Sequence, residues 1–368
     1  MTAETRPGAL RSVLRRPLLR LSAALLGAVL LIPGLSGCAA SAGASPATGP
    51  SKELRLGYFD TVTQAPALVG LQKGLLQKSL GSTKLTSQVF AAGPAAIEAL
   101  SAGAIDAAYI GPNPAVNSFV QSAGQSVRIV AGAASGGAAL VVRPGIGSAS
   151  DLAGKTLATP QLGNTQDVAL RSWLAGQGLK TDTTGGGDVR ITPTENAQTL
   201  ALFKSGKIDG AWLPEPWVSR LVLEAGATVL VDEASLWEKG AFPTTVLLVG
   251  AQFLAEHPKT VRALVAGNAA SVAWLTEHPD QAAAVINTRL AADTGKALPD
   301  AVIERALGAV RFTTDPLAST FPKLLKAGAN VGTAKRGDLH GLFDLSLLND
   351  VLATTGQKPV SAGGLGTE

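Results

Sequence analysis

Cysteine and histidine are scarce in this chain of 368 residues. Cys38 is the only cysteine, so the chain can form neither an intramolecular disulfide nor a cluster of thiolate metal ligands. The three histidines are His257, His278 and His340, and none follows a predicted strand. A hydrolytic triad or a catalytic zinc site needs a histidine in a cleft, so neither is supported. We therefore expect no metal, no cofactor, no catalytic residue and no enzymatic activity.

Motifs for nucleotide binding and for serine hydrolysis are also missing. Gly154-Lys155-Thr156 matches the end of a phosphate-binding loop, but such a loop needs a glycine at the position of Ala149. That loop also leads into a helix, whereas this Gly-Lys-Thr segment leads into a predicted strand. No Gly-x-Ser-x-Gly nucleophile elbow occurs in the sequence. These absences favour a binding protein over an enzyme.

The apolar run near the N-terminus is too short to span a bilayer. Residues 21–32 follow five arginines, which is typical of an export signal, whereas a transmembrane helix needs about 20 apolar residues. Residues 35–38 resemble the bacterial lipobox, in which the thiol of the cysteine, here Cys38, is lipidated. The alternative is an accidental cysteine near a cleavage site. Arg15-Arg16 leaves twin-arginine export open as a route.

We expect residues 1–37 to be a lipoprotein signal peptide and residues 38–52 to be a flexible tether. A lipid on Cys38 would anchor the protein to the bilayer at the outer face of the cell membrane. The signal accounts for the net charge of the chain. The whole chain has 31 basic and 27 acidic residues, and the signal contains five arginines and one glutamate, so 26 of each sign remain. A neutral mature chain does not indicate nucleic-acid binding.

One short pattern occurs twice, about 100 residues apart. Residues 103–116 read G-A-I-D-A-A-Y-I-G-P-N-P-A-V, and residues 206–218 read G-K-I-D-G-A-W-L-P-E-P-W-V. Each copy follows a helical stretch, becomes a short strand and breaks at a Pro-x-Pro corner. The repeat predicts two similar α/β lobes whose strands end at a shared cleft, where a ligand could be enclosed.

Strands alternate with helices through short Gly/Pro turns, which indicates an α/β fold with mainly parallel, Rossmann-like sheets. A strand at residues 242–249 would return the chain to the first lobe. We predict lobe 1 from residues 53–142 and 244–353, lobe 2 from residues 143–243, and a C-terminal tail at residues 354–368. Two crossovers, near Val142 and Pro243, would form the hinge.

Glycine-rich loops at predicted strand ends supply the candidate ligand site. Gly163-Asn164-Thr165 lies between a strand and a helix, where free amides and the helix dipole can bind an anion without a formal positive charge. The alternative is that Asn164 or Thr165 only caps its own helix. Gly93-Pro94 and Ser135-Gly136 offer similar donors. No basic partner for an anion is assigned, neither Arg128 or Arg143 beside the predicted strands nor Arg171 on a predicted helix.

Glu215 is a carboxylate at the second Pro-x-Pro corner. It could pair with a ligand ammonium in the cleft or with an arginine of a membrane permease, or it could be a solvated loop acid. Tyr58, Phe59 and Trp217 could supply aromatic walls, whereas Trp212 and Trp173 are assigned to the core. The predicted ligand-binding residues are Tyr58, Phe59, Gln64, Gly93, Pro94, Asn113, Ser135, Gly136, Gly163, Asn164, Thr165, Glu215 and Trp217.

Together these features resemble the nitrate/sulfonate/taurine (NitT/TauT) family of ABC-transporter substrate-binding proteins. The matching residues are Gly57-Tyr58, Ser101-x-Gly103-x-Ile105-Asp106, Gly111-Pro112-Asn113-Pro114, Asp151-Leu152-x-Gly154-Lys155, and Gly206-x-Ile208-Asp209 with Glu215-Pro216. The resemblance covers roughly residues 53–330. It implies a type II periplasmic-binding fold with two hinge crossovers, capture of a small anion by hinge closure, and delivery to an ABC permease. An aliphatic sulfonate such as taurine is the first expectation for the ligand, followed by nitrate and bicarbonate, and the protein is expected to be a monomer.

Two other functional classes are alternatives. The chain also resembles bacterial pyrimidine-precursor binders and the yeast thiamin-pyrimidine synthase of the same fold. The cysteine-rich motif and active-site histidine of the yeast enzyme have no counterpart in this sequence. A signalling ectodomain would need a membrane span or an attached DNA-binding segment, and the sequence predicts neither.

Overall fold

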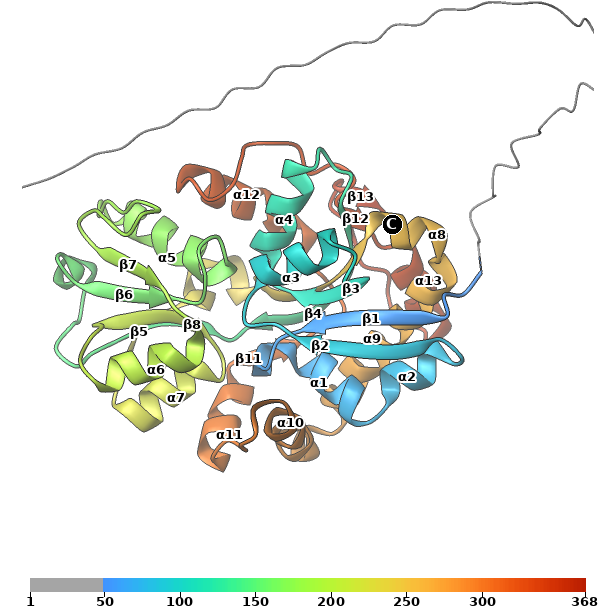
Figure 1. The fold of residues 1–368 in the computed structure, drawn as a ribbon, viewed down its shortest axis with the longest axis horizontal. Coiled ribbons are helices and arrows are strands. Elements are labelled where there is room, and N and C mark those ends of the chain that lie inside the picture. Colours follow the sequence, from blue (N-terminus) through green and yellow to red (C-terminus); the bar gives the residue numbers. More distant parts are fainter. Residues whose placement is uncertain (1–48) are drawn as a thin grey trace, which may run out of the picture. The chain divides into compact units, whose positions relative to one another are not determined.

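The computed structural model describes residues 49–368, so the predicted signal peptide, Cys38 and most of the tether lie outside the described residues. Within this range the chain forms two β-sheets, of eight and five strands, with helices on their faces (Figure 1). The prediction of an α/β fold is therefore confirmed. None of the helices in residues 49–368 combines the length and the apolar character that crossing a membrane would require.

The larger sheet has the order β13-β12-β4-β10-β3-β1-β2, and β11 also pairs with β4. Its strands are β1 (Glu53–Tyr58), β2 (Lys84–Val89), β3 (Ala107–Ile110), β4 (Val127–Gly136), β10 (Pro243–Gly250), β11 (Val310–Phe312), β12 (Phe343–Asp344) and β13 (Gly366–Thr367). β1 is parallel to both β2 and β3, whereas β10 runs antiparallel between β3 and β4.

The smaller sheet repeats this arrangement in the order β7-β6-β8-β5-β9. Its strands are β5 (Ala138–Val142), β6 (Thr156–Thr159), β7 (Arg190–Pro193), β8 (Gly210–Pro214) and β9 (Thr228–Asp232). β6 is parallel to β7 and β8, and β5 runs antiparallel between β8 and β9. In both sheets the first parallel strand lies between the other two, so the lobes share one doubly wound order.

Helices cover both sheets (Figure 1). Those connected to the larger sheet are α1 (Ala65–Gln72), α2 (Leu75–Leu80), α3 (Gly93–Ser101), α4 (Pro112–Gln121), α8 (Ala251–Glu256), α9 (Pro258–Glu277), α10 (Pro279–Thr294), α11 (Asp300–Gly308), α12 (Phe321–Asn330) and α13 (Ser346–Thr354). Those of the smaller sheet are α5 (Thr165–Gly176), α6 (Asn196–Lys204) and α7 (Trp217–Ala225). Short 3₁₀ helices are η1 (Val62–Gln64), η2 (Ala149–Leu152), η3 (Glu233–Leu236), η4 (Glu238–Gly240) and η5 (Ala318–Thr320). Every residue of β3, β5 and β8 is buried, as expected for strands covered on both faces.

The repeated Ile-Asp pair has the same structural role in both lobes. The Asp106 carboxylate accepts a hydrogen bond from Arg55 N at 2.8 Å, and the Asp209 carboxylate accepts one from Thr156 N at 2.8 Å. Each aspartate also donates its own N–H to the carbonyl of the same partner. The two aspartates thus tie the start of β3 to β1 in the larger sheet and the start of β8 to β6 in the smaller sheet.

The first crossover lies earlier in the chain than the sequence analysis places it. Residues 138–142 were expected in lobe 1, but they form β5, which pairs with β8 and β9 in the smaller sheet. The chain crosses at Gly136 and Gly137, whose φ angles of +81° and +73° favour glycine, and not near Val142. A continuous run of apolar residues suits a buried strand in either sheet, so the sequence pattern alone could not show which sheet residues 138–142 join.

The C-terminal segment belongs to the larger sheet and is not a separate tail. Within residues 354–368, Ala362 is buried and β13 pairs in parallel with β12. A strand of two residues is too short to produce a recognisable alternation. We propose corrected boundaries, which define the lobes from here on: lobe 1 is residues 53–136 and 243–368, and lobe 2 is residues 138–242.

Candidate functional site

One cavity lies where the loops after the parallel strands of both lobes meet. Such strand ends are where open α/β sheets usually bind ligands. The residues lining this central cavity are Phe59, Thr61, Thr63, Gln64, Ala91, Ala92, Gly111, Pro160, Asn164, Gln166, Asn196, Pro214, Thr244 and Thr245. Its volume is about 20 Å³, which holds little more than water. The two lobes are therefore closed on each other.

Among the described residues, no charged side chain lines the central cavity. Its polarity comes from hydroxyl and amide groups. Gln64 Oε1 accepts a hydrogen bond from Phe59 N at 3.1 Å, so its NH₂ group remains as a donor. Asn164 is the N-cap residue of α5 and Asn196 is the first residue of α6, and helix N-termini carry a partial positive charge. This arrangement can stabilise a small anion through dipoles and hydrogen bonds.

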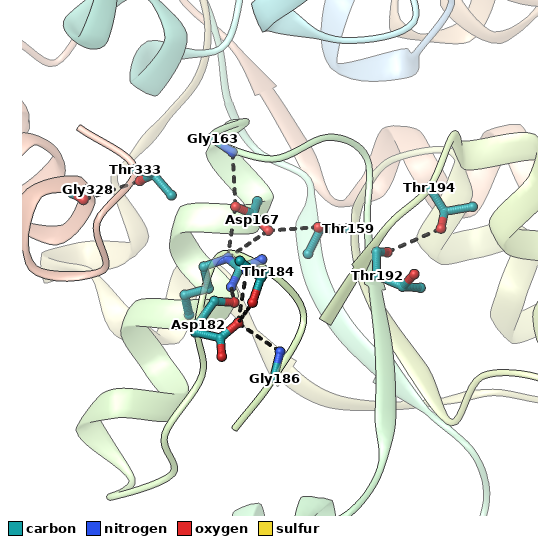
Figure 2. Close-up of polar contacts among 11 residues, drawn as sticks. Thr159, Gly163, Asp167, Asp182, Thr184, Gly186, Thr192, Thr194, Gly328 and Thr333 are labelled. Atoms are coloured by element: carbon teal, nitrogen blue, oxygen red, sulfur yellow. Dashed lines mark hydrogen bonds and ion pairs between the residues drawn. The ribbon is translucent and has the colours of Figure 1, made fainter. Parts of the chain in front are cut away.

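A buried ion pair holds the loop of residues 160–164 in place. Asp167 and Arg171, one turn apart on α5, are at most 1% exposed and lie 3.0 Å apart. The Asp167 carboxylate also accepts hydrogen bonds from Thr159 Oγ1 at 2.9 Å and from Gly163 N at 3.0 Å (Figure 2). It therefore connects the end of β6, the loop and the helix, and it fixes the position of Asn164.

The other two arginines considered from the sequence also have structural partners. Arg128 Nη1 donates to Gly124 O at 2.8 Å, and Arg143 Nε donates to Ile208 O at 2.9 Å. Neither lines the central cavity. An anion held there would be stabilised without an arginine, as the sequence analysis expects of these loops.

The structure brings several predicted site residues together. Phe59, Gln64 and Asn164 line the central cavity. Asn113 and Thr165 meet beside it across the two lobes, where Asn113 N donates to Thr165 Oγ1 at 3.4 Å. Two loops that are about 50 residues apart in the sequence are thus adjacent at the cleft.

Other predicted residues flank the cavity without lining it. A Cβ on Gly93 would lie 2.3 Å from Pro114 Cγ and 3.3 Å from Asn164 Oδ1, so only glycine fits this close approach. Pro94 and Gly163 line a neighbouring pocket between the lobes. Ser135 is buried, and its hydroxyl has no hydrogen-bond partner within residues 49–368. The Gly136 carbonyl accepts a hydrogen bond from Thr244 Oγ1.

A sequence model of the NMT1-like family matches residues 47–291. The match includes strands β1 to β10 and every residue that lines the central cavity. The chain belongs to the NMT1-like family.

Similar proteins bind sulfonates and nitrate. A Bacillus subtilis (strain 168) protein named for binding aliphatic sulfonates is 28% identical over 268 residues, which cover 70% of this chain and 76% of that protein. The alkanesulfonate-binding protein of Xanthomonas axonopodis pv. citri, solved with MOPS bound, has a TM-score of 0.66 at 23% identity and covers 78% of this chain and 96% of its own. The nitrate-binding protein of Synechocystis PCC 6803 has a TM-score of 0.68 at 16% identity, and the match covers 83% of this chain and 90% of that protein. The family resemblance and the type II periplasmic-binding fold are thus confirmed.

In this NMT1-like protein, Glu215 connects the two lobes. The side chain is buried, and its carboxylate lies 3.2 Å from Arg305 Nη1 on α11 of lobe 1. It also accepts a hydrogen bond from Ser219 N at 3.0 Å. Burial raises the pKa of the Glu215 carboxyl, while Ser219 and Arg305 lower it. The interpretation of Glu215 as a solvated loop acid is therefore wrong, because the side chain is buried and pairs with an arginine 90 residues further along the chain. Its pairing with a ligand ammonium or with a permease arginine stays a prediction.

Two aromatic residues predicted to form walls of the site lie elsewhere. Tyr58 donates to Asp293 at 2.9 Å and accepts from Arg289, so it points away from the cavity that Phe59 lines. Tyr58 is the last residue of β1 and Phe59 follows it directly, and side chains alternate in direction along an extended chain, which explains the difference. Burial raises the pKa of Tyr58 to about 12. Trp217 lines a separate, mostly apolar pocket of about 390 Å³ and not the central cavity.

None of the four threonine hydroxyl groups in the lining was predicted from the sequence. Thr61 and Thr63 follow β1 directly, and their position after a predicted strand was the available signal. Thr244 and Thr245 begin the antiparallel strand β10. Ligands of open α/β sheets usually bind at the carboxyl ends of parallel strands. Thr244 and Thr245 lie at the start of an antiparallel strand, so nothing in the sequence marked these two residues as part of a site.

Proposed function

We propose that the protein is the extracytoplasmic substrate-binding component of an ABC importer and that it captures a small anion between its lobes. The observation that carries this proposal is the uncharged central cavity, where the N-termini of α5 and α6 and several amide and hydroxyl groups meet. Membership of the NMT1-like family and the sulfonate-binding and nitrate-binding relatives support it. The proposed role is binding and delivery to a permease, without catalysis.

We propose an aliphatic sulfonate, including taurine, as the ligand class. A sulfonate spreads one negative charge over three oxygen atoms, which suits many neutral donors better than one cationic side chain. Nitrate and bicarbonate are the alternatives among small anions. A pyrimidine precursor remains the alternative of a different class, either as a captured ligand or as the substrate of an enzyme on the same fold.

Closure of the lobes is the proposed mechanism of capture. A ligand that contacts both lobes at once stabilises the closed form by its differential affinity for that form. The closed lobes already share contacts between Glu215 and Arg305 and between Asn113 and Thr165. These contacts would form together with those of the ligand.

The test is a thermal-shift panel on refolded, ligand-free protein. The panel contains taurine, alkanesulfonates, nitrate, bicarbonate and pyrimidine precursors. At a concentration of about 100 times Kd, a bound ligand stabilises the folded state by about 2.7 kcal/mol, which should raise Tm by roughly 5 °C or more. Absence of a shift with every small anion would overturn the proposal, and a shift with a pyrimidine alone would support the alternative.

We also propose that a lipid on Cys38 holds the protein at the membrane. Cys38→Ser should move the protein from the membrane fraction to the soluble fraction. Ser41→Ala, three residues further along the tether, is the matched control and should remain with the membrane. Membrane retention of the Cys38→Ser variant would contradict the anchor.

A further inference from the structure

Arg171 contacts two loops of lobe 2, only one of which reaches the central cavity. Its Nε donates to the Asp167 carboxylate at 3.0 Å, and that carboxylate accepts a hydrogen bond from Gly163 N. Its Nη1 donates to the carbonyl of Asp182 at 2.5 Å. The two nitrogens lie on different edges of the planar guanidinium group. One buried side chain, 1% exposed, therefore connects the loop that precedes α5 with the loop that follows it.

The loop that follows α5, residues 180–188, is a compact turn that we refer to as the Asp182 loop. The Asp182 carboxylate accepts three hydrogen bonds at 2.8 Å, from Thr184 N, Thr184 Oγ1 and Gly186 N (Figure 2). Asp182 N also donates to Gly186 O at 3.1 Å. These bonds give the loop a defined shape, and Arg171 fixes its position relative to α5.

The Asp182 loop meets lobe 1 across the cleft. A Cβ on Gly332 would lie 4.0 Å from Thr183 Cγ2, which is an ordinary van der Waals distance. Thr183 and Gly163 of lobe 2 line one pocket together with residues 332–333 of lobe 1. Thr333 Oγ1 donates to Gly328 O at the end of α12 at 3.2 Å, so the lobe 1 side of this contact is also held in place (Figure 2). Closure of the lobes thus brings two ordered segments together.

We propose that Arg171 is a positioning residue for ligand capture. It couples the loop that carries Asn164 to the central cavity with the Asp182 loop, which contacts lobe 1. A ligand that orders the first loop would also favour the position of the second loop in which the lobes touch, and this contact would slow reopening of the lobes. The coupling between the loops exists without a ligand. Only its use in the capture of a small anion rests on the proposed function.

Two variants each break one end of this connection. Arg171→Lys keeps a cation beside Asp167, but one ammonium cannot replace donors on two edges of a guanidinium, so the contact with the Asp182 loop is lost. Asp182→Ala removes the three hydrogen bonds that shape the loop and leaves the ion pair intact. Asp151→Ala is the matched control. The Asp151 carboxylate also accepts three hydrogen bonds in an exposed turn of lobe 2, from residues 147–148, and none of them involves the Asp182 loop.

Hydrogen exchange of the ligand-free protein, followed by NMR, is the first measurement. The amide of Gly163 donates to Asp167 at 3.0 Å, so its exchange rate reports on the loop at the cavity. Asp182→Ala should raise this rate about tenfold, although α5 separates the two loops in the sequence. In an Arg171→Lys background the same change should add nothing, and Asp151→Ala should keep the wild-type rate. An unchanged rate at Gly163 in Asp182→Ala would overturn the inference.

Stopped-flow kinetics with taurine as the probe is the second measurement. Arg171→Lys and Asp182→Ala should each raise the dissociation rate about tenfold, because the lobes reopen more readily, and change the association rate by less than about twofold. The double variant should also dissociate only about tenfold faster than the wild type, because both changes break the same connection. An increase of about a hundredfold in the double variant would show that the two residues act independently, and would overturn the inference.

The two measurements separate the inference from the proposed function. If Arg171→Lys does not fold, the comparison of Asp182→Ala with Asp151→Ala decides, because only the first of these should change the exchange of Gly163 and the release of taurine. Failure of taurine and of every other small anion to bind would contradict the proposed function. The exchange rate of Gly163 would then still confirm or overturn the coupling through Arg171.

Discussion

Asp167 shows how one buried carboxylate positions the candidate site. It contacts Arg171 on its own helix, Thr159 at the end of β6 and Gly163 in the loop before α5. The loop carries Asn164 to the central cavity. A change at Asp167 should therefore affect both the stability of lobe 2 and the geometry of the cavity.

Asp167→Asn should destabilise the protein by about 3–5 kcal/mol, because Arg171 would be left as an uncompensated buried charge. Urea unfolding measures this loss. Asp151→Asn is the control, since Asp151 is an exposed carboxylate in the capping box at the start of η2 and its loss should be much smaller. An equal loss in the two variants would contradict the role assigned to Asp167.

Glu233 predicts a pH dependence of stability. Its pKa is about 7 in the folded protein and about 4.5 in its ordinary state. Between these values the folded state binds more protons than the unfolded state, so this residue lowers stability as the pH rises through that window. Glu233→Gln carries no charge and should be more stable than the wild type at pH 8, by up to about 3 kcal/mol, and not at pH 4.5. Melting curves at the two pH values check this, and the same difference at both would disprove it.

At the scale of the elements, the repeated aspartates make a paired prediction. Asp106→Ala removes the acceptor for an N–H group of β1, and Asp209→Ala removes the acceptor for one of β6. Each should destabilise the protein by about 1–2 kcal/mol. The free energy of unfolding should fall slightly more in Asp106→Ala, because this change also removes an ion pair with the partly exposed Arg55. Such a pair contributes about 0–1 kcal/mol. Chemical denaturation of both variants tests whether the two aspartates have equivalent roles. A loss of stability in only one of the two variants would refute this.

The sequence was sufficient for the elements and for part of the site. The repeated Ile-Asp strand predicted two lobes, and the loop at Asn164 was recognised because a glycine and a cap precede a helix. The position of β5 was not predictable, because its apolar residues suit either sheet. The role of Glu215 depends on Arg305, which is distant in the sequence and has no local pattern that marks it as a partner.

At the scale of the whole molecule, the ion pair between Glu215 and Arg305 should favour the closed lobes. Arg305→Met leaves the buried Glu215 carboxylate without a cation in the closed form, whereas opening of the lobes would let water solvate it. The closed population should fall, and sulfonate affinity should fall about tenfold with it. Calorimetry measures the affinity, and small-angle scattering of the ligand-free protein measures the opening.

Glu215→Gln combined with Arg305→Met is the control for this prediction. The double variant has no buried charge to solvate, so it should recover part of the affinity that Arg305→Met loses. An Arg305→Met variant with wild-type affinity and compactness would show that the ion pair does not contribute to closure.

The central cavity has a consequence for the ionic conditions under which capture can work. Fixed charges lose their attraction as ionic strength rises, but short hydrogen bonds and helix dipoles inside closed lobes are screened far less. Residues 38–368 contain 26 basic and 26 acidic residues, so this part of the chain provides no net electrostatic steering. Sulfonate affinity and association rate should therefore change by less than about threefold between dilute buffer and about 0.5 M salt, measured by stopped flow. A protein outside the cytoplasm, where the cell does not control salinity, would keep its affinity across those changes.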